Sequence, residues 1–138
     1  MVEETRGRGN TGGGYVKIDF NDVVPIYIQI ANGIEDDILS GRLQEGDHCY
    51  SQVVIAKELN INPATAAKGI RLLVERGVLE KVRGQAMTVR EDAVKMIKQR
   101  KTQETLTDMI ETLVQEAKKL DISQEELIQK IGERFERR

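Results

Sequence analysis

The sequence contains little of what metal sites and disulfide-stabilised folds require. Among its 138 residues there is one cysteine, Cys49, and one histidine, His48. A single cysteine excludes an intrachain disulfide and is compatible with a reducing interior. Neighbouring side chains in a strand point to opposite faces, and no other Cys or His could complete a site around these two. We therefore expect no metal ion and no cofactor, and we expect Cys49 to be a small buried hydrophobe.

Long apolar runs are also absent. No run approaches the ~18 residues that would span a bilayer, and residues 1–14 have no apolar core of the kind found in signal peptides. No glycine-rich phosphate loop follows an expected strand, and no nucleophile has an evident partner base, which argues against an enzyme. The sequence therefore predicts a cytoplasmic protein that is not an enzyme and has no membrane partner.

Charge is distributed unevenly along the chain. The formal net charge is only −2, so any affinity for nucleic acid must come from a local patch. Residues 19–47 carry seven acidic side chains against one basic one, Arg42. Residues 62–90 carry six basic and two acidic side chains, a local balance of plus four; the basic ones are Lys68, Arg71, Arg76, Lys81, Arg83 and Arg90.

The stretch 51–89 organises the chain. Ser51 is a good N-cap for a short first helix, which ends at the sequence Asn60-Ile61-Asn62. Asn62 and Pro63 are well suited to start a second helix, because the missing N–H of proline costs nothing there, and Gly77 ends it. The face of this helix that packs is predicted to contain Ala66, Ile70, Leu73 and Val74. Two short helices joined in this way predict a helix-turn-helix, whose second helix fits the major groove of DNA.

A hairpin is predicted directly after these helices. Residues 78–83 show the apolar and polar alternation of a strand, Gly84 and Gln85 form a turn, and residues 87–89 form the second, antiparallel strand. This hairpin is interpreted as a wing with Arg83 at its tip, able to reach a groove or a phosphate. A brief strand at residues 47–50 is expected to pair with it.

The N-terminal part divides into a leader and a long helix. Residues 1–14 contain five glycines and no periodicity, so we predict a disordered leader. Residues 15–20 are expected to be extended and anchored by Phe20. Residues 25–40 are predicted to be a helix that ends at Gly41, and its core positions are Tyr27, Ile30, Ala31, Ile34 and Ile38. Aromatic residues at helical spacing are more often core than ligand-binding, so Tyr27 is assigned to the core.

The tail, residues 91–138, is predicted to be a helical hairpin. A helical pattern extends to about Lys119, and Ser123 to Glu126 form a capping box before a last helix. Two amphipathic helices alone bury too little to be stable, so a second chain is expected to cover them in a two-fold dimer. The alternative is that they fold back on the winged domain. The predicted dimer contacts are Leu106, Met109, Ile110, Leu113, Ala117, Leu127, Ile131 and Phe135.

Several motifs in order resemble one family. They are Pro25-Ile26-Tyr27-Ile28-Gln29-Ile30, Ile38 to Leu43 with Gly46-Asp47, the helix-turn-helix, and Gly77-Val78-Leu79-Glu80 with Arg83-Gly84. Together they resemble the N-terminal domain of the GntR family of bacterial transcription regulators, over roughly residues 17–90. The pattern of Asn62-Pro63, Thr65 and Lys68, with a tail of under fifty residues, is similar to the YtrA subfamily.

This resemblance implies a mainly α fold with a small β wing: a winged helix-turn-helix at residues 15–90, followed by a helical tail for dimerisation or effector binding. It also implies repression of a neighbouring operon from a pseudo-palindromic DNA operator bound by a homodimer, with release by an effector that the sequence does not identify. Side chains near the start of the second helix can reach base edges, and other side chains position the protein through contacts with the phosphate backbone of DNA. The predicted DNA-binding residues are Ser51, Gln52, Asn62, Ala64, Thr65, Ala67, Lys68, Arg71, Arg83, Gly84 and Gln85. A winged helix that docks a protein and binds no DNA is the alternative, since the fold does not fix the function.

Overall fold

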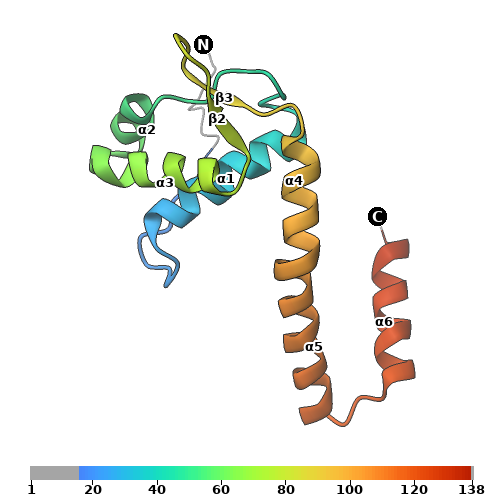
Figure 1. Cartoon of the computed structure of the whole chain (residues 1–138). Coiled ribbons are helices and arrows are strands. Elements are labelled where there is room, and N and C mark those ends of the chain that lie inside the picture. Colours follow the sequence, from blue (N-terminus) through green and yellow to red (C-terminus); the bar gives the residue numbers. More distant parts are fainter. Residues whose placement is uncertain (1–15, 138) are drawn as a thin grey trace. The chain divides into compact units, whose positions relative to one another are not determined.

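The computed structural model of the protein describes residues 16–137 (Figure 1). The predicted leader, residues 1–14, lies outside the described residues. The helices and strands are α1 (Ile26–Ser40), α2 (Gln52–Leu59), α3 (Pro63–Glu75), β2 (Leu79–Lys81), β3 (Met87–Val89), α4 (Ala93–Arg100), η1 (Lys101–Leu106), α5 (Thr107–Lys119) and α6 (Gln124–Glu136). The chain forms two compact units that divide between Lys98 and Gln99.

Helix α1 is the central helix of the first unit. It follows Pro25 and ends at Gly41, whose φ of 84° is favourable only for a residue without a side chain. Its predicted core positions Ile30, Ala31, Ile34 and Ile38 are buried, as expected from their spacing. Tyr27, however, is only half-buried. The core assignment of Tyr27 is therefore only partly correct.

The segment before α1 differs from the prediction. Phe20 leaves 66% of its surface exposed and does not anchor the segment. The buried residue there is Val16, which belongs to the core cluster together with residues of α1. Phe20 is held outward because it lies in a turn, in which the N–H of Asp22 donates to the carbonyl of Asp19.

The helix-turn-helix forms as its capping residues predict. The Ser51 hydroxyl accepts from the N–H of Val54, and Asn60 ends α2 with a left-handed φ of 55°. The Asn62 side chain accepts from the N–H of Ala64, with Pro63 in the first turn of α3. Of the four residues predicted to pack, Ala66, Ile70 and Leu73 are buried, but Val74 is 38% exposed because it lies at the edge of the stripe.

Helices α1 and α3 approach each other closely at Gly69. A Cβ atom at this position would lie 3.0 Å from both the Tyr27 carbonyl oxygen and the Ile30 Cγ2 atom. Figure 1 shows α3 crossing α1, with α2 packed beside α3. The absence of a side chain at Gly69 therefore permits this close packing of α3 against α1.

The predicted wing is a two-stranded antiparallel hairpin. Strand β2 pairs with β3 so that Glu80 lies opposite Thr88, and Gly84 turns the chain with a φ of 78°. His48 forms an isolated bridge with Thr88, which confirms the predicted pairing of the preceding segment with the wing. The following residue, Cys49, is buried in the core as expected.

Helix α4 begins inside the first unit. Its residues Ala93 and Ile97 are fully buried in the core cluster, so the first unit extends beyond Arg90. The carboxylate of Glu45, 49 residues earlier in the chain, accepts a hydrogen bond from the N–H of Val94 at 2.9 Å. A carboxylate at the start of a helix satisfies a free N–H and complements the helix dipole.

The second unit contains the predicted helical hairpin. It includes a six-residue π-helical segment, η1, that the sequence pattern did not predict. Within this unit α5 and α6 run in opposite directions (Figure 1). The Ser123 hydroxyl accepts from the N–H of Glu126, which confirms the predicted cap of the last helix. None of the described helices combines the length and the apolar character needed to cross a bilayer.

Candidate nucleic-acid interface

The exposed face of α3 presents polar and basic side chains. Asn62, Ala64, Lys68 and Arg71 are all exposed, whereas Ala67 is half-buried. Asn62 uses its side-chain oxygen to cap the helix, at 2.8 Å from the Ala64 nitrogen, so its NH₂ group remains as a donor. The structure thus places most of the DNA contacts predicted on α3 on one accessible face. Asn62 and Ala64 lie at the N-terminus of α3, which is the positive end of the helix dipole.

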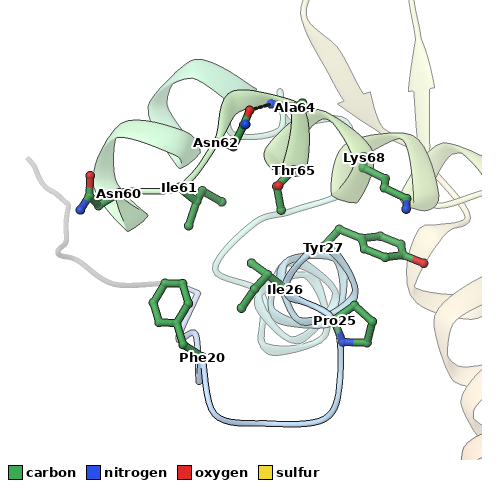
Figure 2. Close-up of a pocket in the computed structure, with 10 residues that line it drawn as sticks. All are labelled: Phe20, Pro25, Ile26, Tyr27, Asn60, Ile61, Asn62, Ala64, Thr65 and Lys68. Carbon is green, nitrogen blue, oxygen red and sulfur yellow. Dashed lines mark hydrogen bonds between the residues drawn. The ribbon is translucent and has the colours of Figure 1, made fainter.

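Thr65 is oriented differently from this set. It is half-buried, and Figure 2 shows its side chain directed from α3 toward α1. Since the buried Ala66 follows it, Thr65 lies at the border between the exposed face and the packed face. The Thr65 side chain, one of the predicted DNA contacts, is therefore less accessible to DNA than those of its exposed neighbours.

The start of α2 offers two more polar groups. Ser51 and Gln52 are exposed, and the Ser51 hydroxyl lies 3.1 Å from the Val54 nitrogen that it caps. Helix N-termini of this kind present free N–H groups, which suit the anionic oxygens of phosphate. Both residues therefore remain suited to contacts with the phosphate backbone of DNA.

The tip of the wing is exposed and internally braced. Arg83, Gly84 and Gln85 lie in the turn, and the Gln85 N–H donates to the Val82 carbonyl. The Lys81 ammonium donates to the Gln85 carbonyl at 2.8 Å, which closes the turn. The Arg83 guanidinium is therefore carried on a short loop of defined shape.

The local positive charge is smaller than the sequence count implies. Arg76 pairs with the buried carboxylate of Glu35 at 3.2 Å, and Arg90 pairs with Asp92 at the same distance. These two arginines have structural partners and are not available to contact phosphate without breaking those pairs. The basic groups that remain for a ligand on this surface are Lys68, Arg71, Lys81 and Arg83.

The ammonium of Lys68 has an aromatic neighbour that the sequence did not reveal. It lies 4.1 Å from the centre of the Tyr27 ring, within the range of a cation–π contact. Figure 2 shows Lys68 reaching from α3 toward this ring on α1. Helical spacing alone assigned Tyr27 to the core. The contact with Lys68 could not be found in that spacing, because it forms only where α3 crosses α1.

The described residues offer little for metal or thiol chemistry. No group of three or more His, Cys, Asp and Glu side chains within residues 16–137 is arranged to hold a metal ion. Burial raises the pKa of the Cys49 thiol to about 12, which keeps it protonated and unreactive at neutral pH.

The second unit exposes an apolar surface along both of its long helices. Of the predicted dimer contacts, Leu106, Met109, Ile110, Leu113, Ile131 and Phe135 are exposed, from 39% for Ile131 to 87% for Phe135. Leu127 is half-buried. Ala117 is buried beside the turn that ends α5, where Ile122 donates to its carbonyl, so it offers a partner little surface. Leu120 and Ile128, which belong to the same apolar stripes, are 63% and 59% exposed.

Two capped helices in sequence, followed by a short antiparallel hairpin, define a winged helix-turn-helix protein. No family model matches the chain. The chain is 31% identical over 114 residues to the uncharacterized HTH-type transcriptional regulator YhcF of Bacillus subtilis, a match that covers 81% of this chain and 91% of YhcF. It is also 31% identical over 78 residues to the HTH-type transcriptional repressor YtrA of the same bacterium, covering 56% of this chain and 60% of YtrA.

A solved structure agrees with these relatives. A GntR family transcriptional regulator from Listeria monocytogenes superposes with a TM-score of 0.67 and 30% identity, covering 83% of this chain and 98% of that one. The chain therefore belongs to the GntR family of DNA-binding transcription regulators, and the resemblance found in the sequence is confirmed. Two longer curated transcription regulators are matched over only 29% of their own length.

Proposed function

We propose that this protein represses transcription by binding a pseudo-palindromic DNA operator as a homodimer. The observation that carries the proposal is the exposed face of α3, where Lys68 and Arg71 lie on a helix whose opposite face is packed in the core. A helix held in this way can enter a major groove without unfolding its own domain.

Base readout is assigned to α3. Arg71 and Lys68 can donate to guanine O6 and N7, and the Ala64 and Ala67 methyl groups can contact the methyl group of thymine. Asn62 retains NH₂ donors for a base edge or a phosphate. Because each base pair presents a distinct pattern of donors, acceptors and methyl groups in the major groove, these few side chains would account for the sequence preference.

Backbone contact is assigned to the wing and to α2. Arg83, Gly84 and Gln85 present a cation and a small turn, while Ser51 and Gln52 present polar groups at a helix N-terminus. Such contacts fix the position of the protein on the duplex and weaken as salt rises. The winged domain, residues 15–90 in the sequence analysis, would thus combine both kinds of contact.

The homodimer is assigned to the tail, residues 91–138. The exposed apolar side chains of α5 and α6 would be covered by the same side chains of a second copy, since a two-fold interface is self-complementary. Two copies would present two recognition helices to half-sites separated by whole turns of DNA. Ala117 contributes to this interface only as a small residue that permits close approach.

Repression is inferred from a relative's name, since YtrA of Bacillus subtilis is named a repressor. A regulator of this type would act in the cytoplasm, where a bacterial operator lies. Footprinting the purified protein on the DNA flanking its own gene tests the proposal. A protected pseudo-palindrome is expected, whereas the absence of protection at low salt would favour a protein-docking module instead.

A further inference from the structure

A groove of about 780 Å³ lies between the start of α1 and the start of α3 (Figure 2). Most of its lining is apolar and comes from α1 and the loop before it, from the turn before α3 and from the first turn of α3: Phe20, Pro25, Ile26, Tyr27, Ile61 and Ala64. The groove is open to solvent on one side, and its volume lies within the range of sites for small organic molecules, which are likewise mostly apolar with a few polar groups that fix the orientation of the ligand.

The exposed Phe20 ring belongs to a braced loop. The Gln29 side chain accepts from the N–H of Asp19 at 2.8 Å and donates to the carbonyls of Asp19 and Val24 at 2.9 and 2.8 Å. The carboxylates of Asp19 and Asp22 accept further hydrogen bonds within the loop. The loop therefore has a defined shape that presents Phe20 to the groove rather than to the core.

The opposite end of the groove is cationic. Lys68 lines it, and the other polar groups in the lining are the Asn60 and Asn62 amides and the Thr65 hydroxyl. No acidic side chain is among the described residues that line this groove. The Lys68 ammonium rests on the Tyr27 ring, 4.1 Å from its centre, and such a cation–π contact is weak at an accessible site. A carboxylate would offer that ammonium a stronger, charge-assisted hydrogen bond.

We propose that this groove binds a small aromatic carboxylate, with the carboxylate at Lys68 and the ring on the adjoining apolar surface of Tyr27 and Ile26 (Figure 2). The proposal rests on the proposed function for its consequence, because Asn62, Ala64, Thr65 and Lys68 both line the groove and belong to the predicted DNA contacts. A ligand that holds Lys68 removes it from the duplex. By thermodynamic linkage, ligand and DNA must then weaken each other's binding by the same factor.

Ligand binding is tested without DNA. The full-length ¹⁵N-labelled protein is titrated with phenylacetate, with neutral phenylacetamide and with benzylamine as a cation of similar shape. Amide signals of Ile26, Tyr27 and Lys68 are expected to shift with phenylacetate at about tenfold lower concentration than with phenylacetamide, the usual range for a hydrogen bond to a charged group. Benzylamine should bind least well. Equal shifts with all three probes, or shifts that avoid the groove, would overturn the proposal.

Two variants separate the charge from the apolar surface. Lys68→Gln should abolish the preference for phenylacetate over phenylacetamide while both still bind, and the matched Lys57→Gln, outside the groove, should preserve it. Tyr27→Phe keeps the ring and should retain binding. If Lys68→Gln leaves the preference intact, the proposed anion site is wrong.

The regulatory consequence is tested by adding phenylacetate to the complex with a protected duplex. Release of the duplex by the carboxylate, but not by the amide, is expected. Binding of the probe with no release would overturn the coupling. Should the protein bind no duplex at all, the proposed function fails, while the titration without DNA still decides whether the groove takes a carboxylate.

Discussion

The guanidinium of Arg76 lies 3.2 Å from the carboxylate of Glu35, a side chain that is completely buried on α1. The same Arg76 nitrogen donates to the Asn32 side chain at 3.1 Å. Arg76 is the C-cap of α3, so this pair joins the end of the recognition helix to the central helix. The pair accounts for Glu35, one of the two buried acidic residues of α1, and removes Arg76 from the charge available to DNA.

Replacing Arg76 with alanine should destabilise the winged domain. Removing one partner leaves the Glu35 carboxylate buried without its arginine, and such losses cost about 3–5 kcal/mol. This cost is measured as the difference in the free energy of unfolding in urea between the variant and the unmodified protein. Arg42→Ala is the control: Arg42 is mostly exposed, and its buried partner Asp37, 3.6 Å away, also accepts from the Tyr50 hydroxyl at 2.7 Å, so the loss of Arg42 should cost less, about 1 kcal/mol. Equal costs for the two variants would show that the buried pair has no special role.

A second prediction concerns two glycines inside helices. Alanine favours a helix over glycine by about 1 kcal/mol, and Gly132→Ala in α6 should gain about that much, since a Cβ there would have no neighbour within 4 Å. Gly69→Ala should instead cost about 1–3 kcal/mol, because its Cβ would meet α1 at 3.0 Å. Urea unfolding monitored by circular dichroism distinguishes them. A stabilising Gly69→Ala would mean that the two helices do not pack as described.

The thiol of Cys49 should be nearly inert in the folded protein. Burial raises its pKa from an ordinary value of 9.0 to about 12, so its thiolate fraction at pH 8 is on the order of a thousandfold lower than that of an exposed cysteine. Labelling with a thiol-specific reagent should be slow in buffer and rapid in urea. Because the folded pKa is the higher one, this group favours folding below pH 9, and that contribution is lost as the pH rises toward 12. Rapid labelling of the folded protein would contradict the burial.

The dimer prediction is tested by charge placed on the apolar stripe. Leu113→Asp should give monomers on a sizing column, because an aspartate buried at an interface pays a large desolvation cost. Gln115→Asp adds the same charge at an exposed position on the other side of α5 and should leave the dimer intact. A dimer that survives Leu113→Asp would place the interface elsewhere.

Sequence reasoning located the elements well because their ends depend on local chemistry. Ser51, Asn62 and Ser123 cap the helices that they were predicted to start, and Gly41 ends the first helix. These signals involve residues within a few positions of each other, so they can be found without knowing the fold.

What sequence reasoning missed depends on contacts between distant segments. Glu45 caps a helix 49 residues later, and Lys68 meets Tyr27 only because α3 crosses α1. Counting charges likewise could not show that Arg76 has a buried partner. The exposed Phe20 ring and the inward orientation of Thr65 follow from the same three-dimensional packing, and periodicity does not encode them.

In the proposed complex, α3 reads bases while the wing contacts the phosphate backbone of the DNA. Fluorescence anisotropy with the footprinted operator, single-base variants of it and an unrelated duplex, at several salt concentrations, tests this most directly. Arg71→Ala should weaken operator binding by about 1–3 kcal/mol and relax the preference at one base pair, whereas Arg83→Ala should weaken all duplexes alike and lower the salt slope by about one. Arg42→Ala, in the acidic segment, should change neither. Equal, sequence-independent losses from Arg71→Ala and Arg83→Ala would contradict the account.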